Sequence, residues 1–239
     1  ETMKNFVPRH TETPDKIDLD RDVLKPNIAS GRIYAYDTPE YIKDMGTPDR
    51  FFEVEEDFKS GKVNSRNLKN KQKAVFLDRD GTINKYVGFL TKPEQFELIP
   101  GVAEVIKKIN KSGYLAIVVT NQPVIARGDC TWEELQIIHD KMETELGKGG
   151  AFLDGIYICP HHPDKGFKGE CHDYKIKCSC RKPAPGLLFQ AALDFNIDLS
   201  QSYMIGDEDR DMEAGVNAGC GKVYRVIKDK FQMLNQIKF

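Results

Sequence analysis

The sequence predicts a three-layered α/β domain built on a parallel sheet, running from about Ala74 to the C-terminus. Short apolar runs alternate there with segments whose apolar residues recur three or four positions apart, which is the helical period. Strands that are apolar on both faces belong to parallel sheets covered by helices on both sides. The chain has 239 residues, 40% of them hydrophobic, which is enough for one core of ordinary size and a smaller piece.

The order of the runs predicts the order of the elements. The expected strands are 74–77, 115–119, 155–159, 203–205 and 222–226, and the expected helices are 101–110, 131–146, 185–195 and 210–218. Thr131 followed by Glu134 is a capping box, which predicts a helix start. Gly113, Gly147 and Gly219 stand where helices are expected to end.

The N-terminal quarter of the chain differs in composition from the rest. Residues 60–73 are basic, polar and poor in apolar side chains, which indicates a linker. The preceding segment, 1–59, has too few apolar runs for a core of its own. We therefore expect an N-terminal appendage that packs on another body, a linker at 60–73, and the α/β domain at 74–239.

Charge and cysteine usage exclude several classes of protein. The net charge of -2 and the pI near 6.3 give no global field for nucleic acid or anionic membranes. No run approaches the roughly 18 apolar residues of a membrane span. Four of the six cysteines crowd together beside histidines, which favours metal ligation in a reducing cytoplasm over a disulfide framework.

Polar residues follow most of the expected strands. The first strand leads into Asp78-Arg-Asp-Gly-Thr82, the second into Thr120-Asn121-Gln122, and the fourth into Gly206 and an acidic run that ends at Asp211. Arg181 and Lys182 stand after the third strand, at the head of a helix. Ligands of open α/β sheets bind at the carboxyl ends of the strands, so we expect these groups to form one site.

The chemistry of this set suits attack on a phosphate ester. The Asp78 carboxylate would approach a dianion, so the repulsion must first be neutralised. Hard oxygen ligands from Asp78 and Asp207 can hold Mg²⁺ for this purpose. Lys182 would place a second positive charge against the phosphoryl oxygens, and the Thr120 hydroxyl would add a hydrogen bond.

The remaining acidic groups have supporting parts in this scheme. Asp80 lies two residues after Asp78 and points to the same side of an extended chain. It can protonate the leaving alkoxide and later deprotonate the water that hydrolyses the aspartyl-phosphate. Asp211 is a candidate for supporting the metal ligands from behind, and Asp209 for a helix N-terminal charge.

These motifs resemble those of a known superfamily. Asp78-Arg-Asp-Gly-Thr, Thr120-Asn, Arg181-Lys182-Pro and Gly206-Asp-x-x-x-Asp are similar to the four motifs of the haloacid dehalogenase superfamily. The resemblance implies a Rossmann-like sheet, a phosphoaspartate on Asp78, acid–base work by Asp80, and magnesium held by Asp78, the Asp80 carbonyl and Asp207. The gaps between the motifs are short, so no large cap domain is expected.

A second cluster predicts a structural zinc site. Cys159 and His161 form one closely spaced pair, and Cys178 and Cys180 form another. Three thiolates and one imidazole suit tetrahedral Zn²⁺ and leave no open coordination position. Such a site would brace the loop that carries Arg181 and Lys182. The rival ligands are Cys171, His162 and His172.

The zinc loop narrows the resemblance. Asp78-Arg-Asp-Gly-Thr-Ile-Asn, Thr120-Asn-Gln-x-x-Ile-Ala-Arg-Gly, Asp154-Gly-Ile-Tyr-x-Cys-Pro-His-His-Pro and Cys178-x-Cys-Arg-Lys-Pro-x-Pro-Gly look like the D-glycero-D-manno-heptose 1,7-bisphosphate 7-phosphatase family. That family implies substrate contacts by Tyr86, Val87, Gly88, Phe89, Thr120, Asn121, Arg181 and Lys182. The chain departs from the family at Pro123-Val124 (usually Ser-Gly), at Glu208, and by an insertion around 165–174.

Other assignments stay open on the sequence. Histidinol-phosphate phosphatases share the zinc loop, although Ile125-Ala-Arg127-Gly128 and the paired histidines favour the heptose family. A phospho-acceptor signalling module also uses Asp, Thr and Lys, but it places them in a different order along the chain. Arg127 is as consistent with a plain surface charge as with a role in the site, and His139 is expected to be a surface or packing residue.

The front of the chain carries a separate resemblance. Leu19-Asp-Arg-Asp-Val-Leu-Lys-Pro, Gly31-Arg-Ile-Tyr-Ala-Tyr and Tyr41-Ile-Lys-Asp-Met-Gly-Thr-Pro-Asp-Arg look like the closing segment of a sugar-phosphate nucleotidyltransferase. The resemblance implies a fused or cognate nucleotidyltransferase upstream, fed by the sugar 1-phosphate that the phosphatase releases. No Gly-rich nucleotide-binding start is present, so this segment is not expected to transfer nucleotides itself.

Overall fold

The computed structural model describes residues 17–34, 38–166 and 168–230 of the chain. The chain divides into two compact units, 1–38 and 39–239. The described part of the first unit holds a π-helical turn η2 (Leu19–Leu24), α1 (Lys25–Asn27) and a 3₁₀ turn η3 (Ile28–Ser30). Ala35 and Tyr36, which belong to the nucleotidyltransferase resemblance, lie outside the described residues.

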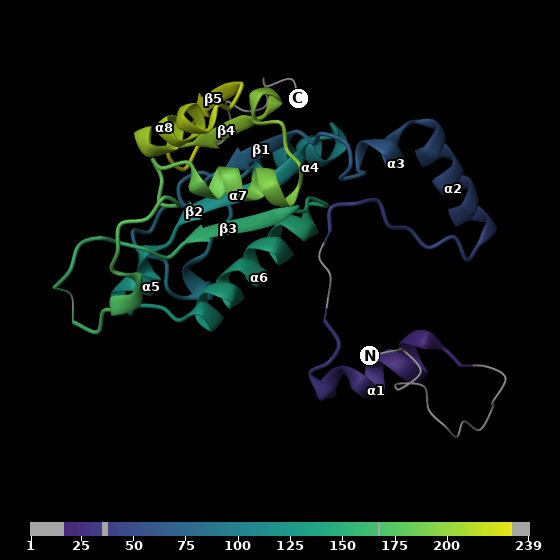
Figure 1. Cartoon of the computed structure of the whole chain (residues 1–239), viewed down its shortest axis with the longest axis horizontal. Coiled ribbons are helices and arrows are strands. Elements are labelled where there is room, and N and C mark those ends of the chain that lie inside the picture. The colour runs from purple at the N-terminus through teal and green to yellow at the C-terminus, as the bar shows by residue number, and fades with distance from the viewer. Residues whose placement is uncertain (1–16, 35–37, 167, 231–239) are drawn as a thin grey trace. The chain divides into compact units, whose positions relative to one another are not determined.

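The second unit is built on one parallel sheet, as the sequence predicts (Figure 1). Its strands are β1 (Ala74–Leu77), β2 (Leu115–Asn121), β3 (Gly155–Cys159), β4 (Tyr203–Gly206) and β5 (Lys222–Arg225). They lie in the order β3-β2-β1-β4-β5. Leu77 pairs with Val118 of β2 and with Ile205 of β4, so the carboxyl ends of the three central strands reach the same edge.

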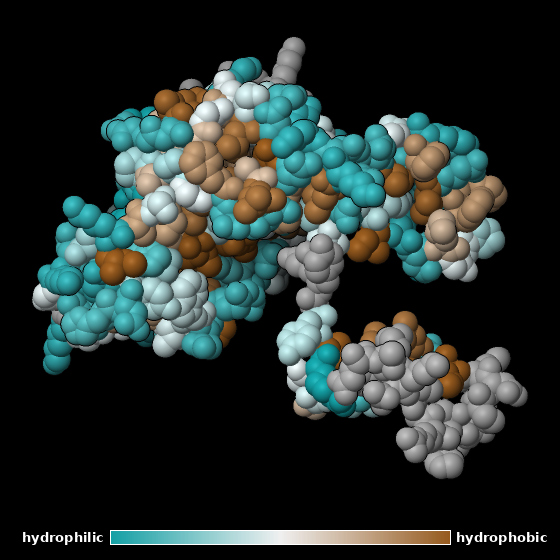
Figure 2. All heavy atoms as spheres, in the orientation of Figure 1, coloured by the Kyte–Doolittle hydropathy of each residue, from teal (hydrophilic) through white to brown (hydrophobic). Residues whose placement is uncertain are grey.

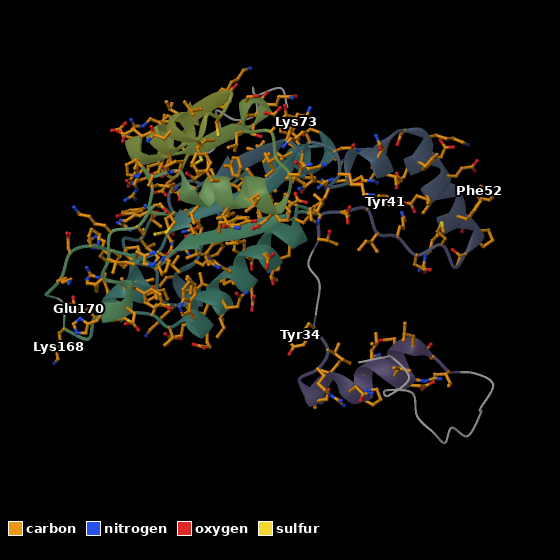
Figure 3. The ribbon with its side chains drawn as sticks, viewed as in Figure 1. Tyr34, Tyr41, Phe52, Lys73, Lys168 and Glu170 are labelled. Atoms are coloured by element: carbon orange, nitrogen blue, oxygen red, sulfur yellow. The ribbon has the colours of Figure 1, made fainter. Side chains whose placement is uncertain are left out.

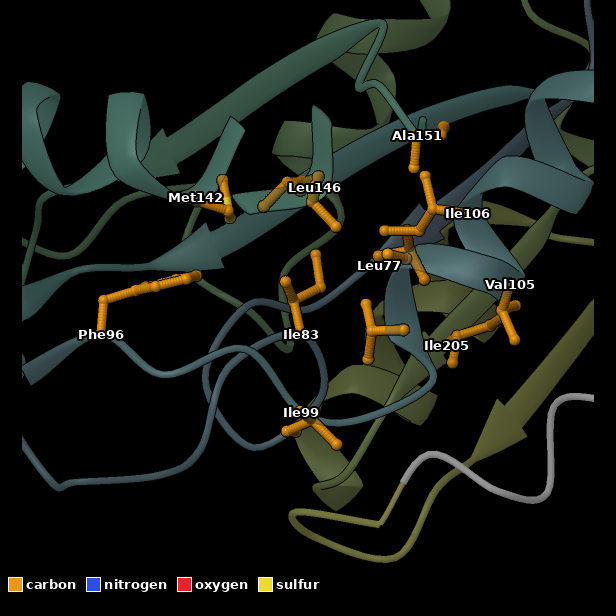
Figure 4. Close-up of a cluster of buried hydrophobic side chains, with 14 of the residues drawn as sticks. Leu77, Ile83, Phe96, Ile99, Val105, Ile106, Met142, Leu146, Ala151 and Ile205 are labelled. Carbon is orange, nitrogen blue, oxygen red and sulfur yellow. The ribbon is translucent and has the colours of Figure 1, made fainter. Parts of the chain in front are cut away.

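Helices cover both faces of the sheet, which confirms the three-layered α/β class. The long helices are α4 (Val102–Lys111), α6 (Trp132–Lys148), α7 (Gly186–Asp194) and α8 (Asp209–Ala218). Val75 and Leu77 of β1 pack into one cluster with side chains of α4 and α6, part of which Figure 4 shows. Ala74 and Phe76 face the opposite cluster, with side chains of α7 and α8. Every residue of β1 is buried, as expected of a central parallel strand.

The sequence left several short elements unassigned. These are α5 (Pro123–Arg127), η4 (Pro93–Gln95), η5 (His172–Tyr174) and η6 (Leu199–Gln201). Thr131 caps α6 as expected: its hydroxyl accepts from the Glu134 amide at 3.1 Å, and Glu134 accepts from the Thr131 amide at 2.8 Å. The expected stop at Gly147 is wrong. The helix continues to Lys148, because an isolated glycine weakens a helix without ending it.

The segment before the sheet is more structured than its composition indicates. It forms α2 (Pro48–Lys59) and α3 (Lys62–Ser65), and the Tyr41 hydroxyl donates to Asp57 of α2 at 2.8 Å (Figure 3). Exposed phenylalanines, among them Phe52, lie on α2, where Figure 2 shows apolar surface. The first compact unit ends at Thr38, so α2 and α3 belong to the second unit.

Residues 60–73 are anchored to the α/β domain. The Arg66 guanidinium donates to the buried Asp154 carboxylate at 2.8 Å, and the backbone N–H of Gln72 donates to the Asn196 carbonyl at 3.0 Å. Both a polar side chain and the backbone of this segment are therefore used as contacts. Within the described ranges, no helix is both long and apolar enough to cross a membrane.

Candidate active site

Three polar side chains meet at the carboxyl edge of the sheet. Asp78 follows β1 directly, Asp211 lies in the first turn of α8, and Lys182 comes from the loop before α7. The Lys182 Nζ lies 2.7 Å from Asp78 Oδ1 and 2.7 Å from Asp211 Oδ1. All three are buried, so the lysine is held by two carboxylates in a dry environment.

Asp207 completes a group of three carboxylates with Asp78 and Asp211. One oxygen from each residue lies within 4.8 Å of the others. Asp207 Oδ2 is buried and has no hydrogen-bond partner among the described residues, and its ionic partner is Lys228 Nζ at 3.3 Å. The chain turns close to this carboxylate at Gly81, which has a φ of +81°, and a Cβ there would lie 2.6 Å from Asp207 Oδ2.

The charges of this group are incompletely balanced. Burial raises the pKa of Asp78 to about 7, with the negative charge of Asp211 adding to the effect and Lys182 opposing it. Burial also raises the pKa of Asp207, although Lys228 opposes it. Three buried carboxylates facing one buried lysine leave negative charge and hard oxygen donors at one point. The set fits a divalent cation such as Mg²⁺.

Asp80 is held by several donors. Arg79 Nη2 donates to both of its oxygens, at 3.0 and 2.9 Å, the Asn84 amide donates at 3.0 Å, and the Gln122 amide at 2.8 Å. Burial alone would raise the pKa of this carboxyl, but the Arg79 charge and these hydrogen bonds together hold the pKa below its ordinary value.

The residues at the end of β2 brace the site. Asn121 exchanges two hydrogen bonds with the backbone of Lys182: its amide donates to the Lys182 carbonyl, and its oxygen accepts from the Lys182 amide, both at 3.0 Å. The Thr120 hydroxyl is buried and accepts from Gln122 at 2.8 Å. Asn121 thus fixes the loop that carries Lys182.

A cleft of about 230 Å³ opens beside the carboxylates. Besides Asp78, the expected substrate and catalytic residues that line it include Asp80, Tyr86, Gly88, Phe89, Asn121 and Arg181. Lys182 lines it as well, whereas Val87 and Thr120 do not. Tyr86 and Phe89 are about half exposed, and their rings are covered by Lys228 at 3.9 Å and by Arg127 at 4.4 Å.

The cleft also contains polar and charged residues that the sequence did not predict as substrate or catalytic residues. His162, Glu208 and Arg210 line it together with Arg181. Arg210 Nη2 lies 2.8 Å from Glu208 Oε2, while its Nε is buried and has no hydrogen-bond partner among the described residues. Burial lowers the pKa of Arg181, and the charge of Arg210 adds to this effect. Arg210 was not predicted as a site residue because it stands within an acidic run, which we interpreted as metal ligands and helix N-terminal charges.

The cysteines and the histidine of the expected zinc loop come together in space. Cys180 Sγ lies 3.2 Å from Cys159 Sγ and 3.3 Å from Cys178 Sγ, and His161 Nδ1 lies 3.3 Å from Cys180 Sγ. Within the described ranges this cluster of four includes none of the rival ligands Cys171, His162 and His172. The donor set fits a tetrahedral Zn²⁺ ion.

This cluster is joined to the cleft by the backbone of its own loop. Arg181 follows Cys180 directly, and its guanidinium donates to the His161 carbonyl at 3.1 Å. Arg181 is therefore held at both ends by residues of the cluster. Figure 3 shows Lys168 and Glu170, which lie on the long part of this loop.

Comparisons with known proteins agree with this geometry. A family model described as HAD-hydrolase-like matches residues 179–224. The D-glycero-beta-D-manno-heptose-1,7-bisphosphate 7-phosphatase of Yersinia pestis is 43% identical over 148 residues, which cover 62% of this chain and 77% of the relative. The enzyme of the same name from Haemophilus ducreyi is 45% identical over 149 residues, covering 62% and 79%.

A solved structure gives the same result. The D,D-heptose 1,7-bisphosphate phosphatase of B. bronchiseptica, crystallised with magnesium and phosphate, has a TM-score of 0.56 and 34% identity, and the match covers 63% of this chain and 79% of that one. The fold, the cluster of carboxylates around a buried lysine and these similarities lead to one conclusion. This chain belongs to the D-glycero-beta-D-manno-heptose-1,7-bisphosphate 7-phosphatase family of haloacid dehalogenase-like phosphatases.

Proposed function

We propose that this protein removes the 7-phosphate of D-glycero-D-manno-heptose 1,7-bisphosphate through an aspartyl-phosphate on Asp78. The observation that carries the proposal is the buried contact of Asp78 with Lys182, at 2.7 Å, at the head of a cleft. A carboxylate held against a lysine at the end of a strand is placed to attack an anionic phosphoryl group. The two relatives described above are named for this activity.

The attack requires that negative charge be offset on both sides. Lys182 lies against the Asp78 carboxylate and would face the phosphoryl oxygens of a bound ester. Asp78, Asp207 and the Asp80 carbonyl would hold Mg²⁺, which supplies further positive charge at the phosphoryl group when bound. Asp211 keeps Lys182 in place from the other side at 2.7 Å. Asp78 would then form the new bond to phosphorus as the sugar alkoxide leaves.

Asp80 would act as the general acid of the first half-reaction and as the general base of the second. It lines the cleft two residues after Asp78, so in its protonated form it can donate a proton to the leaving sugar oxygen. Once ionised, it can take a proton from the water that attacks the phosphoaspartate. Its hydrogen bonds from Arg79, Asn84 and Gln122 favour the ionised form, which is the base needed for this second step.

The charges of the cleft support a substrate with a second anionic group. Lys182 is used by the reacting phosphate, yet Arg181 and Arg210 also line the cleft. The guanidinium groups of Arg181 and Arg210 carry N–H donors from which a second phosphate could accept hydrogen bonds. A bisphosphate would therefore also relieve the repulsion between the two arginines.

The carboxylate of Glu208 in the cleft favours the alternative substrate, histidinol phosphate, because that compound carries a positively charged amine. The Glu208 carboxylate already has two cationic partners, Arg210 at 2.8 Å and Lys228 at 3.2 Å. A third cation would have to displace one of them. The bisphosphate remains the better fit, and a phospho-acceptor signalling role is disfavoured by family membership.

We further propose that Cys159, His161, Cys178 and Cys180 hold a structural Zn²⁺. The sulfur atoms of these thiols lie only 3.2 to 3.6 Å apart, although no disulfide joins them. A Zn²⁺ ion bound by all of them would account for this close approach. The site would stabilise the loop and fix Arg181, whose guanidinium is bonded to the His161 carbonyl. Zinc would take no part in the chemical step.

The domain assignment completes the proposal. Residues 1–59 would correspond to the closing segment of a sugar-phosphate nucleotidyltransferase, 60–73 to a connecting segment and 74–239 to the phosphatase. Removing the 7-phosphate leaves a sugar 1-phosphate, which is the class of compound that a nucleotidyltransferase activates. A fused or cognate enzyme of this kind, in the cytoplasm, is the partner that the chemistry suggests.

The test is phosphate release from heptose 1,7-bisphosphate, histidinol phosphate and hexose bisphosphates by the wild type and by Asp78→Asn. We expect the highest kcat/KM with the heptose bisphosphate. Asp78→Asn should abolish turnover, because an amide cannot attack phosphorus, while the fold and zinc content stay unchanged. Undiminished turnover in this variant would rule out the mechanism.

A further inference from the structure

A buried arginine and a buried histidine lie behind the active site. Arg79 follows the nucleophile in the chain and is completely buried, and His139, on α6, is 1% exposed. The Arg79 Nη1 lies 3.1 Å from His139 Nε2. His139 does not line the cleft, so it has no direct contact with a bound substrate.

The protonation state of His139 follows from its partner. A guanidinium has only donors, so the ring nitrogen facing it must be an acceptor. His139 is therefore neutral, with its proton on Nδ1. Burial lowers its pKa to about 3, and the nearby Arg79 charge acts in the same direction. The histidine thus stays a neutral acceptor throughout the neutral pH range.

The other side of the guanidinium holds Asp80. Nε donates to Asp80 Oδ1 at 3.2 Å, and Nη2 donates to both carboxylate oxygens at 3.0 and 2.9 Å. A planar fork of this kind fixes the carboxylate in direction as well as in distance. The orientation of the guanidinium also depends on the hydrogen-bond acceptor of Nη1, because a buried N–H without an acceptor lowers the stability of the fold.

We propose that His139 is a positioning residue for Asp80, acting through Arg79. Its ring nitrogen gives Nη1 an acceptor in a dry site, and this fixes the plane of the guanidinium and thereby the carboxylate that exchanges protons with substrate and water. The inference rests on the proposed acid–base role of Asp80. It adds a residue on α6 to a mechanism whose other parts lie at the ends of the strands.

Two substitutions separate positioning from packing. His139→Leu keeps the volume and removes the acceptor, whereas His139→Gln places an amide oxygen near the position of Nε2. Ile138→Val, on the same helix and equally buried in the core, is the matched control for a simple loss of packing. Melting temperature and zinc content are measured for all three.

The readout is the ratio of kcat/KM for an alkyl phosphate to kcat/KM for p-nitrophenyl phosphate. Loss of the sugar alkoxide needs a proton from Asp80, while nitrophenolate leaves without one, so a misplaced Asp80 lowers only the first value. We expect His139→Leu to lower kcat/KM for heptose bisphosphate about tenfold through kcat, a part of the roughly 10²–10⁴-fold that a positioned acid–base group supplies. The value for p-nitrophenyl phosphate should change less than about twofold, and His139→Gln should recover most of the loss.

Equal losses on both substrates, or a His139→Gln variant as impaired as His139→Leu, would overturn the inference. So would an unchanged ratio in His139→Leu. Failure of the proposed function has a different signature, since the wild type would then release no phosphate from heptose bisphosphate. In that case the same ratio is measured with the best alkyl phosphate of the screen, so the role of His139 is decided separately.

Discussion

Asp78 shows how burial at a single residue links catalysis to pH. The pKa of its carboxyl is about 7 in the folded chain without metal, against an ordinary value of 3.8, because burial disfavours the charge. Because the pKa is higher in the folded state, the protonated carboxyl contributes to the free energy of unfolding. This contribution is complete below the ordinary pKa and is lost as the pH rises through about 7. The metal-free protein should therefore lose stability between about pH 4 and pH 7 through this residue.

The prediction is tested by melting curves in EDTA across this range. Wild type should show a declining melting temperature, and Asp78→Asn, which carries no titrating group there, should show a shallower decline. Adding Mg²⁺ should flatten the wild-type curve, since a cation stabilises the ionised carboxylates. An identical slope in the two proteins would show that burial of Asp78 is not the cause.

Arg210 gives a second prediction at the residue scale. Arg210→Ala should raise KM for heptose 1,7-bisphosphate about tenfold or more, since a hydrogen bond to a charged group contributes roughly 1.5–3 kcal/mol. The kcat/KM for a sugar with a single phosphate should change little. Lys148→Ala, which removes an exposed cation from α6, is the control for net charge. Equal effects on both substrates would argue against a second phosphate near Arg210.

The sequence predicts some residues of the site far better than others. Asp78 directly follows β1 and Lys182 lies in the loop just before α7, so the topology brings both to the carboxyl edge of the sheet. Arg210 and His139 depend on how far α8 and α6 are rotated against the sheet, which no local pattern specifies. His139 was expected to be a packing or surface residue, and its packing is what places it against Arg79.

The zinc loop is the element whose removal has the clearest expected result. Cys180→Ala should release bound zinc and lower stability by about 2 kcal/mol, or roughly 4–8 °C in melting temperature, because metal binding is coupled to folding of the loop. KM should rise as well, since Arg181 follows this cysteine and depends on the His161 carbonyl.

Cys171→Ser is the matched control within the same loop. Cys171 lies outside the cluster of four donors, so its variant should keep one zinc ion per chain and the wild-type melting temperature. Zinc loss in Cys171→Ser, or full zinc content in Cys180→Ala, would contradict the assignment. Metal content by atomic spectroscopy and calorimetric melting decide between these outcomes.

Elements with strong periodicity were predicted with near-correct bounds. The apolar run of β1 and the capped helix α6 are examples, because their patterns are set by burial on the sheet and by the Thr131 capping box. The five-residue helix α5 was missed, since it is too short to show a helical period. Its first residue is Pro123, which suits a helix start but occurs as often in turns.

At the scale of the whole chain, composition was a poor guide to where a compact unit begins. Residues 60–73 are polar, but their polar groups contact the α/β domain. Arg66 and Asp154 form an ion pair with side chains only 11% and 3% exposed, and the Asn196 amide donates to the Leu68 carbonyl at 2.9 Å. A buried ion pair between distant segments leaves no sign in local composition, because neither partner is apolar.

The contacts of Arg66 lead to a prediction about shortened chains. A chain that begins at Pro39, where the second compact unit starts, should keep the melting temperature and the kcat/KM of the full chain within about twofold, since it retains these contacts. A chain that begins at Ala74 should be less stable by at least about 1–3 kcal/mol, because Asp154 stays buried without its guanidinium partner. Urea unfolding measures the difference, and Arg66→Ala in the full chain should reproduce much of it. Equal stability of the two shortened chains would mean that 39–73 contributes nothing to the stability of the domain, as expected if 60–73 is only a linker.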